Sequence, residues 1–96
     1  MTVLSDAEIA EALTHLDWQR DGDSLCKSVK GKNFAAALAW VNSVGALAEA
    51  ANHHPDIDIR WNVVTLKLTT HSEGGLTSGD VALATQVDAL PGPALT

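Results

Sequence analysis

The chain has 96 residues, a formal net charge of −6 and 46% hydrophobic residues. This length predicts one domain, and the hydrophobic content excludes a disordered chain. The negative charge argues against binding to nucleic acid or an anionic membrane, and the single cysteine, Cys26, excludes an internal disulfide and favours a reducing, cytoplasmic compartment. The chain opens without a basic segment followed by an apolar run, and no apolar run approaches membrane-spanning length, so we expect neither a signal peptide nor a membrane span.

The first predicted element is a helix that begins after Ser5. Ser5 and Glu8 have the S-x-x-E spacing of a capping box, in which each side chain bonds the backbone N–H of the other residue. The Asp-Gly pair at 21–22 then predicts a hairpin turn between a short strand that starts at Trp18 and a longer strand over 25–29.

A long helix is predicted over Phe34–Ala51, with Asn33 as its N-cap. We expect its main apolar stripe to face the sheet, and this stripe comprises Phe34, Ala37, Leu38, Val41, Val44 and Ala48. Trp40 and Leu47 lie away from that stripe. Two interpretations of Trp40 are open: it covers the edge of the core, or it belongs to a subunit interface, from which a small domain would gain stability. We predict a homo-oligomer held partly by this second face.

Alternating apolar and polar residues predict two further strands, one over 57–61 and one over 63–70. In the second of these strands Val64, Leu66 and Leu68 should face inward, because successive side chains of a strand point to opposite faces. Thr and Lys residues take the alternate positions and should face outward.

The last predicted element is a helix capped by Thr77 or Ser78 and ended by the Pro-Gly-Pro sequence at 91–93. The element order is therefore helix, strand, strand, helix, strand, strand, helix. This order predicts an α+β fold, with three helices packed on one face of a four-stranded antiparallel sheet. We expect a single domain over 1–90 and a disordered tail over 91–96.

Three of the four histidines fall within 49–80. His53 and His54 precede Pro55, which disfavours helix at His54, and His71 follows the last predicted strand. These residues could be structural, could bind a metal ion, or could form an acid–base pair. Adjacent histidines in an extended segment point to opposite sides, which argues against one shared ion. Imidazole titrates near neutrality, so one ring can hold a proton while another accepts one.

This segment resembles the signature of the pterin-4a-carbinolamine dehydratase family. The family pattern is an acidic residue, three positions, His-His-Pro, an aromatic residue after a short gap, a histidine and then an aspartate. The chain matches these places in order with Glu49, His53, His54, Pro55, Trp61, His71 and Asp80. The motifs N-H-H-P-D and T-H-x-x-G-G-L-T are specific in combination, and the resemblance covers all but about the last six residues. One departure is Asn52, where some members carry an acid that could orient His53.

The resemblance implies elimination of water from 4a-hydroxytetrahydropterin to give quinonoid dihydropterin, without a metal, nucleotide or redox cofactor. It implies a catalytic set of His53, His54 and His71, in which His53 and His71 form the acid–base pair and His54 is the imidazole that binds substrate. The substrate-binding residues would be His53, His54, Pro55, Thr70, His71, Ser72 and Glu73. Glu49, Asp80 and Trp61 would support the site, although Asp80 is explained equally well as a capping acid at a helix N-terminus.

A second class of function stays open. Relatives of this family include a dimerisation cofactor of a transcription factor and scaffold-like homologues, which use the same fold with altered or spare sites. The full histidine set in this chain favours the enzyme over a binding or assembly module. Family members form dimers and tetramers, so the resemblance also implies a homo-oligomer.

Overall fold

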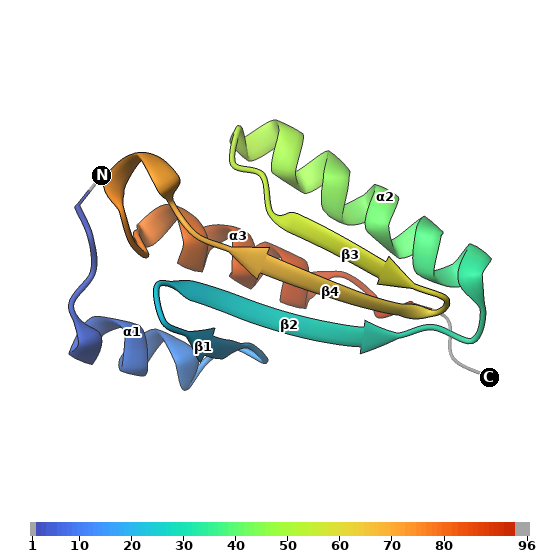
Figure 1. Cartoon of the computed structure of the whole chain (residues 1–96), viewed down its shortest axis with the longest axis horizontal. Coiled ribbons are helices and arrows are strands. Elements are labelled where there is room, and N and C mark those ends of the chain that lie inside the picture. The colour runs from blue at the N-terminus through green and yellow to red at the C-terminus, as the bar shows by residue number, and fades with distance from the viewer. Residues whose placement is uncertain (1, 94–96) are drawn as a thin grey trace.

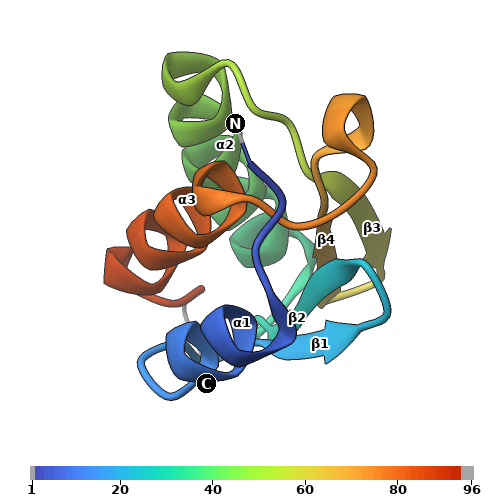
Figure 2. The ribbon, with the colours of Figure 1, turned by 90° about the vertical axis from the view of Figure 1, so that its left-hand side faces the viewer.

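The computed structural model describes residues 2–93 as an antiparallel four-stranded sheet with three helices on one of its faces (Figure 1). The elements are α1 (Asp6–Leu13), β1 (Gln19–Asp21), β2 (Ser24–Lys30), α2 (Phe34–Ala51), β3 (Asp56–Arg60), β4 (Val63–Leu68), the 3-10 helix η1 (His71–Glu73) and α3 (Ser78–Ala89). Figure 2 shows the helices on one side of the sheet and the other side uncovered. The predicted fold class and element order are confirmed.

The sheet has the strand order β1-β2-β4-β3, so β1 and β3 are its edges. Central strand β4 supplies much of the core, since Val64, Leu66 and Leu68 are all fully buried, as the alternation predicted. Their partners on the helix-facing side include Leu25, in register with Leu68, and Ile59, in register with Val64. The opposite face carries polar side chains, as expected for an antiparallel sheet that faces water on one side.

Helix α1 begins at the predicted capping box. The Ser5 hydroxyl accepts the backbone N–H of Glu8 at 3.1 Å, and the Glu8 carboxylate accepts the backbone N–H of Ser5 at 2.9 Å. The hydrogen bond from the Ser5 backbone, followed by the interaction with the Ser5 side chain, lowers the pKa of Glu8 below its ordinary value. Glu8 therefore stabilises the helix N-terminus in its ionised form.

We expect Ser5→Ala to lower the free energy of unfolding, measured by urea unfolding, by about 1 kcal/mol, because α1 loses its N-cap.

The folded pKa of Glu8 is depressed, so the contribution of Glu8 to stability is present above the ordinary carboxyl pKa. This contribution is lost as pH falls through the folded value. The stability difference between wild type and Glu8→Ala, measured by urea unfolding, should therefore shrink in acid. Glu11→Ala, an exposed acid of the same helix, is the control. A Glu8→Ala difference that does not vary with pH would contradict this role.

Helix α2 has the predicted bounds and caps. The Asn33 side chain accepts the backbone N–H of Ala36 at 2.8 Å. At the other end Asn52 takes the left-handed conformation with φ 48° and ψ 43°, as its residue type favours. This residue turns the chain sharply out of the helix and so determines the direction in which the following histidines leave it.

The buried face of α2 differs from the predicted stripe. Its buried residues are Ala37, Val44 and Ala48, as predicted, together with Trp40, which was placed outside that stripe. Phe34 and Leu38, which were expected to face the sheet, are 46% and 41% exposed, whereas Trp40 is only 4% exposed. Trp40 thus belongs to the core of its own chain, and its predicted place in a subunit interface is wrong. The indole ring buries a large apolar area in a helix whose other inward residues are small.

By length and composition alone α2 could also cross a membrane, contrary to the expectation that no apolar run approaches that length. It is the one helix among residues 2–93 that meets this criterion. A core helix meets the same criterion, and the Trp40 face of α2 packs into the core here. Only this face of α2 is buried, since Phe34 and Leu38 of the same helix are exposed.

The expected disordered tail over 91–96 lies partly outside the described residues, which end at 93. Gly92 and Pro93 line a hollow of about 220 Å³ together with residues of α2. One of those residues is Trp40, whose indole N–H is buried without a hydrogen-bond partner. The chain after α3 thus returns to the helix that carries Trp40.

Candidate active site

A pocket of about 440 Å³ is formed where the C-terminal end of α2, the segment after β4 and one face of α3 come together. These segments meet at one end of the molecule, on the left in Figure 1. The pocket is lined by Ala51, Asn52, His53, Thr70, Ser72, Glu73, Gly79, Ala82, Leu83 and Gln86. Its volume is in the range of small-molecule sites, and its lining combines apolar atoms with a few polar groups.

Asp80 lies behind this pocket and is fully buried. One carboxylate oxygen, Oδ2, accepts the backbone N–H of Thr77 at 2.9 Å and the hydroxyl of Thr70 at 2.7 Å. The other oxygen, Oδ1, lies 2.5 Å from Nε2 of His53. Burying a carboxylate is unfavourable without such partners. Asp80 therefore caps α3 with one oxygen and holds His53 with the other.

The contact with Asp80 determines which nitrogen of His53 is basic. An ionised carboxylate can only accept, so His53 donates through Nε2–H. In the neutral ring this leaves Nδ1 without a proton. The side chain of His53 is 20% exposed and lines the pocket. His53 can therefore accept a proton from a ligand through Nδ1 while Asp80 stabilises the resulting imidazolium.

His54 has a different partner. Its Nε2 lies 2.5 Å from a carboxylate oxygen of Glu49, and the two side chains are 54% and 80% exposed. The adjacent histidines thus meet separate carboxylates. Among residues 2–93 no group of three His, Cys, Asp or Glu side chains is placed to hold one metal ion.

The structure brings only part of the predicted set to the pocket. His53, Thr70, Ser72 and Glu73 line it, whereas His54, Pro55 and Glu49 do not. His71 is exposed in η1, between Thr70 and Ser72, and its own side chain is not part of the lining. The substrate-binding role of His54 stays a prediction.

Trp61, which was expected to support the site, is not part of the pocket lining. Trp61 is 67% exposed in the turn after β3, at the opposite end of that strand from His53, and takes a positive φ of 55°. On α3, Gly79, Ala82 and Gln86 line the pocket, and none was predicted. Their spacing places them on a face of α3 beside its core stripe, but the sequence does not show what that face borders.

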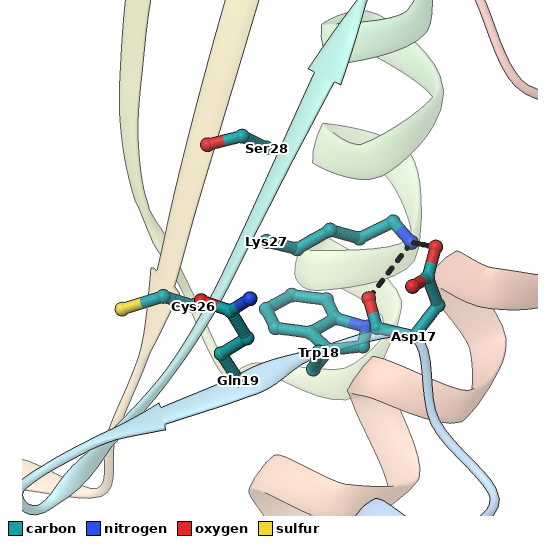
Figure 3. Close-up of a pocket in the computed structure, with 6 residues that line it drawn as sticks. All are labelled: Asp17, Trp18, Gln19, Cys26, Lys27 and Ser28. Carbon is teal, nitrogen blue, oxygen red and sulfur yellow. Dashed lines mark hydrogen bonds and ion pairs between the residues drawn. The ribbon is translucent and has the colours of Figure 1, made fainter.

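A second pocket, of about 350 Å³, lies where β1 separates from β2 (Figure 3). The Lys27 ammonium contacts the carbonyl of Asp17 at 3.1 Å, its carboxylate at 3.2 Å, and the Asp88 carboxylate at 3.0 Å. The Trp18 indole donates to Asp88 at 2.9 Å. The Lys27 side chain is only 10% exposed. These groups already satisfy one another and tie β2 to α3, so we assign this pocket a structural role.

Comparison with known proteins agrees with this geometry. The family model for pterin 4 alpha carbinolamine dehydratase matches residues 2–90. A relative from Nocardia farcinica is 54% identical and covers 92% of this chain and 94% of its own length. A relative from Roseiflexus sp. strain RS-1 is 57% identical, with 91% and 95% covered. Both relatives carry the provisional name pterin-4-alpha-carbinolamine dehydratase.

Two solved structures share the fold. A transcriptional coactivator/pterin dehydratase from Brucella melitensis has a TM-score of 0.87 and 34% identity, covering 92% of this chain and 97% of its own. A pterin dehydratase-like protein identified as a RuBisCO assembly factor in the alpha-carboxysome has a TM-score of 0.61 and 25% identity, covering 77% and 86%. The extent of the family match and of the identity to these relatives shows that the chain belongs to the pterin 4 alpha carbinolamine dehydratase family.

Proposed function

We propose that this protein eliminates water from 4a-hydroxytetrahydropterin to give quinonoid dihydropterin. The observation that carries the proposal is the pairing of His53 with the buried Asp80 on the wall of a pocket of small-molecule size. Family membership supports the same reaction class. The free thiol of Cys26 suits the reducing conditions of the cytoplasm, where we place the reaction.

The elimination needs one base and one acid. In the proposed reaction Nδ1 of His53 takes the proton from a ring nitrogen of the pterin. The electrons of that N–H bond form the new C=N bond of the product. The C–O bond breaks as the 4a-hydroxyl receives a proton and leaves as water. Asp80 favours the first transfer, because the negative carboxylate stabilises the imidazolium that forms.

We assign His71 as the proton donor to the leaving hydroxyl. His71 is exposed and lies in the chain between Thr70 and Ser72, which both line the pocket, so its backbone is beside the site. Exposure keeps the imidazole in exchange with water, from which it can regain a proton after each turnover. Histidine is suited to this task because its charge changes near neutrality.

The direct test is an assay with synthetic 4a-hydroxytetrahydropterin in which absorbance reports the rate of dehydration. The rate with protein is compared with the uncatalysed rate in the same buffer. We expect a rate that rises in proportion to protein concentration. A rate equal to that of buffer would reject the dehydratase and favour an assembly or dimerisation role. The similarity to a RuBisCO assembly factor makes that role the alternative, whereas the intact His53–Asp80 pair favours catalysis.

We also propose that the protein is a homo-oligomer, with an interface that differs from the one predicted at Trp40. Four large apolar side chains are exposed on α2, on β3 and in the turn after β3. We call them the edge patch, which consists of Phe34 and Leu38 on α2, Ile57 on β3 and Trp61 in the turn. The edge strand β3 adds unpaired backbone groups, since β4 pairs with it on one side only. Covering these groups with a second copy would remove apolar surface from water.

Leu38→Glu should therefore dissociate the oligomer, because the substitution places a charge in the edge patch. Sedimentation velocity at micromolar concentration should show an oligomer for wild type and a smaller species for the variant. Gln19→Glu adds the same charge on the opposite edge strand, β1, and should leave the oligomer intact. A monomeric wild type would refute the proposal, and an unchanged oligomer in Leu38→Glu would exclude the edge patch.

A further inference from the structure

The hydroxyl of Thr70 is directed toward the protein, although Thr70 lines the pocket. Its oxygen lies 2.7 Å from Oδ2 of Asp80 and 2.9 Å from the hydroxyl of Thr77. Thr77 is fully buried, as is Asp80. Both contacts of the Thr70 hydroxyl are therefore shielded from water, and the hydroxyl is engaged by Asp80 in place of a substrate.

The direction of the hydrogen bond to Asp80 can be assigned. The carboxylate of Asp80 has no proton to give, so the Thr70 hydroxyl donates to it. The oxygen of Thr70 also lies 2.9 Å from the hydroxyl of Thr77, and the Thr77 oxygen accepts the backbone N–H of Gly79 at 3.2 Å. Donors thus converge on Asp80 from Thr70 on one side and from His53 on the other.

We propose that Thr70 is a positioning residue that sets how strongly Asp80 attracts the proton of His53. Asp80 has no exposed surface, so water cannot replace a lost donor. Each donor takes up part of the carboxylate charge, and the remainder acts on the imidazole. With the Thr70 hydroxyl in place, less of the carboxylate charge acts on the imidazole of His53. The catalytic consequence rests on the proposed function, whereas the effect on His53 does not.

Other titratable groups surround this arrangement. Glu73 lines the same pocket, and His71 precedes it in η1. The His54–Glu49 pair lies at the end of α2, next to His53 in the chain. None of them bonds the Thr70 hydroxyl, whose partners are Asp80 and Thr77. Substitution of Thr70 therefore changes the Asp80–His53 pair while these charges stay in place.

The experiment compares Thr70→Val, which removes the hydroxyl but keeps the branched shape, with Thr70→Ser, which keeps the hydroxyl. Thr69→Val is the matched control, because the neighbouring Thr69 hydroxyl donates to the carbonyl of Asp23, outside this network. The first readout is the titration of His53 by ¹⁵N NMR of histidine-labelled protein. We expect Thr70→Val to raise the midpoint by about one pH unit, and Thr70→Ser to restore it.

The second readout is the pH profile of kcat/KM for 4a-hydroxytetrahydropterin. Thr70→Val should move the acid limb to higher pH by about one unit, so that kcat/KM falls up to about 10-fold on that limb and less at higher pH. A purely structural role would lower kcat/KM at every pH without moving the limb. Thr70→Ala serves as a second variant if the valine protein does not fold.

The NMR result separates this proposal from the proposed function. An unmoved His53 midpoint in Thr70→Val would overturn the positioning role, even if turnover fell. A raised midpoint in a protein whose wild type does not accelerate dehydration would support the role of Thr70 and reject the dehydratase. A midpoint raised in Thr70→Ser as much as in Thr70→Val would also overturn the proposal, because the serine hydroxyl can make the same bond.

Discussion

Replacing His53 with alanine should lower kcat/KM for dehydration by about 10²–10⁴-fold, the usual contribution of a positioned general base. The expectation follows from the pocket position of His53 and from its bond to a carboxylate without exposed surface. Initial rates with synthetic 4a-hydroxytetrahydropterin, corrected for the uncatalysed reaction, give the measurement. Turnover close to wild type would exclude His53 as the base.

Two other histidine variants sharpen that result. His15→Ala is the control, because His15 is exposed on the surface beside Glu11 and should leave turnover unchanged. His71→Ala tests the proposed proton donor, and we expect a loss of similar order to that in His53→Ala. A large loss in His53→Ala with normal turnover in His71→Ala would support His53 as the base. The proton donor would then be another group or water.

Replacing Asp80 with alanine should impair folding as well as catalysis. The substitution removes the acidic half of the capping box of α3, whose N-cap is Thr77. The buried backbone N–H of Thr77 then lacks its carboxylate partner. We expect the free energy of unfolding to fall by about 1–3 kcal/mol, measured by urea denaturation at neutral pH. Asp58→Ala, on the exposed strand β3, is the control and should change stability little.

Asp80→Asn separates the two roles of this side chain. An amide oxygen can still accept the backbone N–H of Thr77, so most of the stability should remain. The neutral amide cannot stabilise the imidazolium of His53, so turnover should still fall by at least 10-fold. Wild-type turnover in a well-folded Asp80→Asn protein would show that the carboxylate serves only as a cap.

Much of the fold follows from short-range patterns in the sequence. The capping box of Ser5 and Glu8, the N-cap Asn33 and the left-handed Asn52 are determined by residues within a few positions of each other. The alternation in β4 likewise determines which side chains are buried once a sheet forms. These features were predictable because the backbone geometry of a turn or strand depends on local chemistry.

The buried face of α2 depended on tertiary packing. Apolar residues lie on nearly every side of this helix, so the helical period does not single out one face. Only the position of the sheet decides that Trp40 enters the core while Phe34 and Leu38 remain at the surface beside an edge strand. Packing selects the face that fills the space above β4 without voids.

The site was predictable in its residue types but not in its pairings. The sequence alone predicted that three histidines, two acids and the Gly-Gly turn belong to one functional segment. The tertiary structure decided that His53 meets Asp80, 27 residues away, that His54 meets Glu49, and that the hydroxyl of Thr70 faces the carboxylate. These contacts depend on how α3 docks against α2 and β4, and that docking is determined by the whole core.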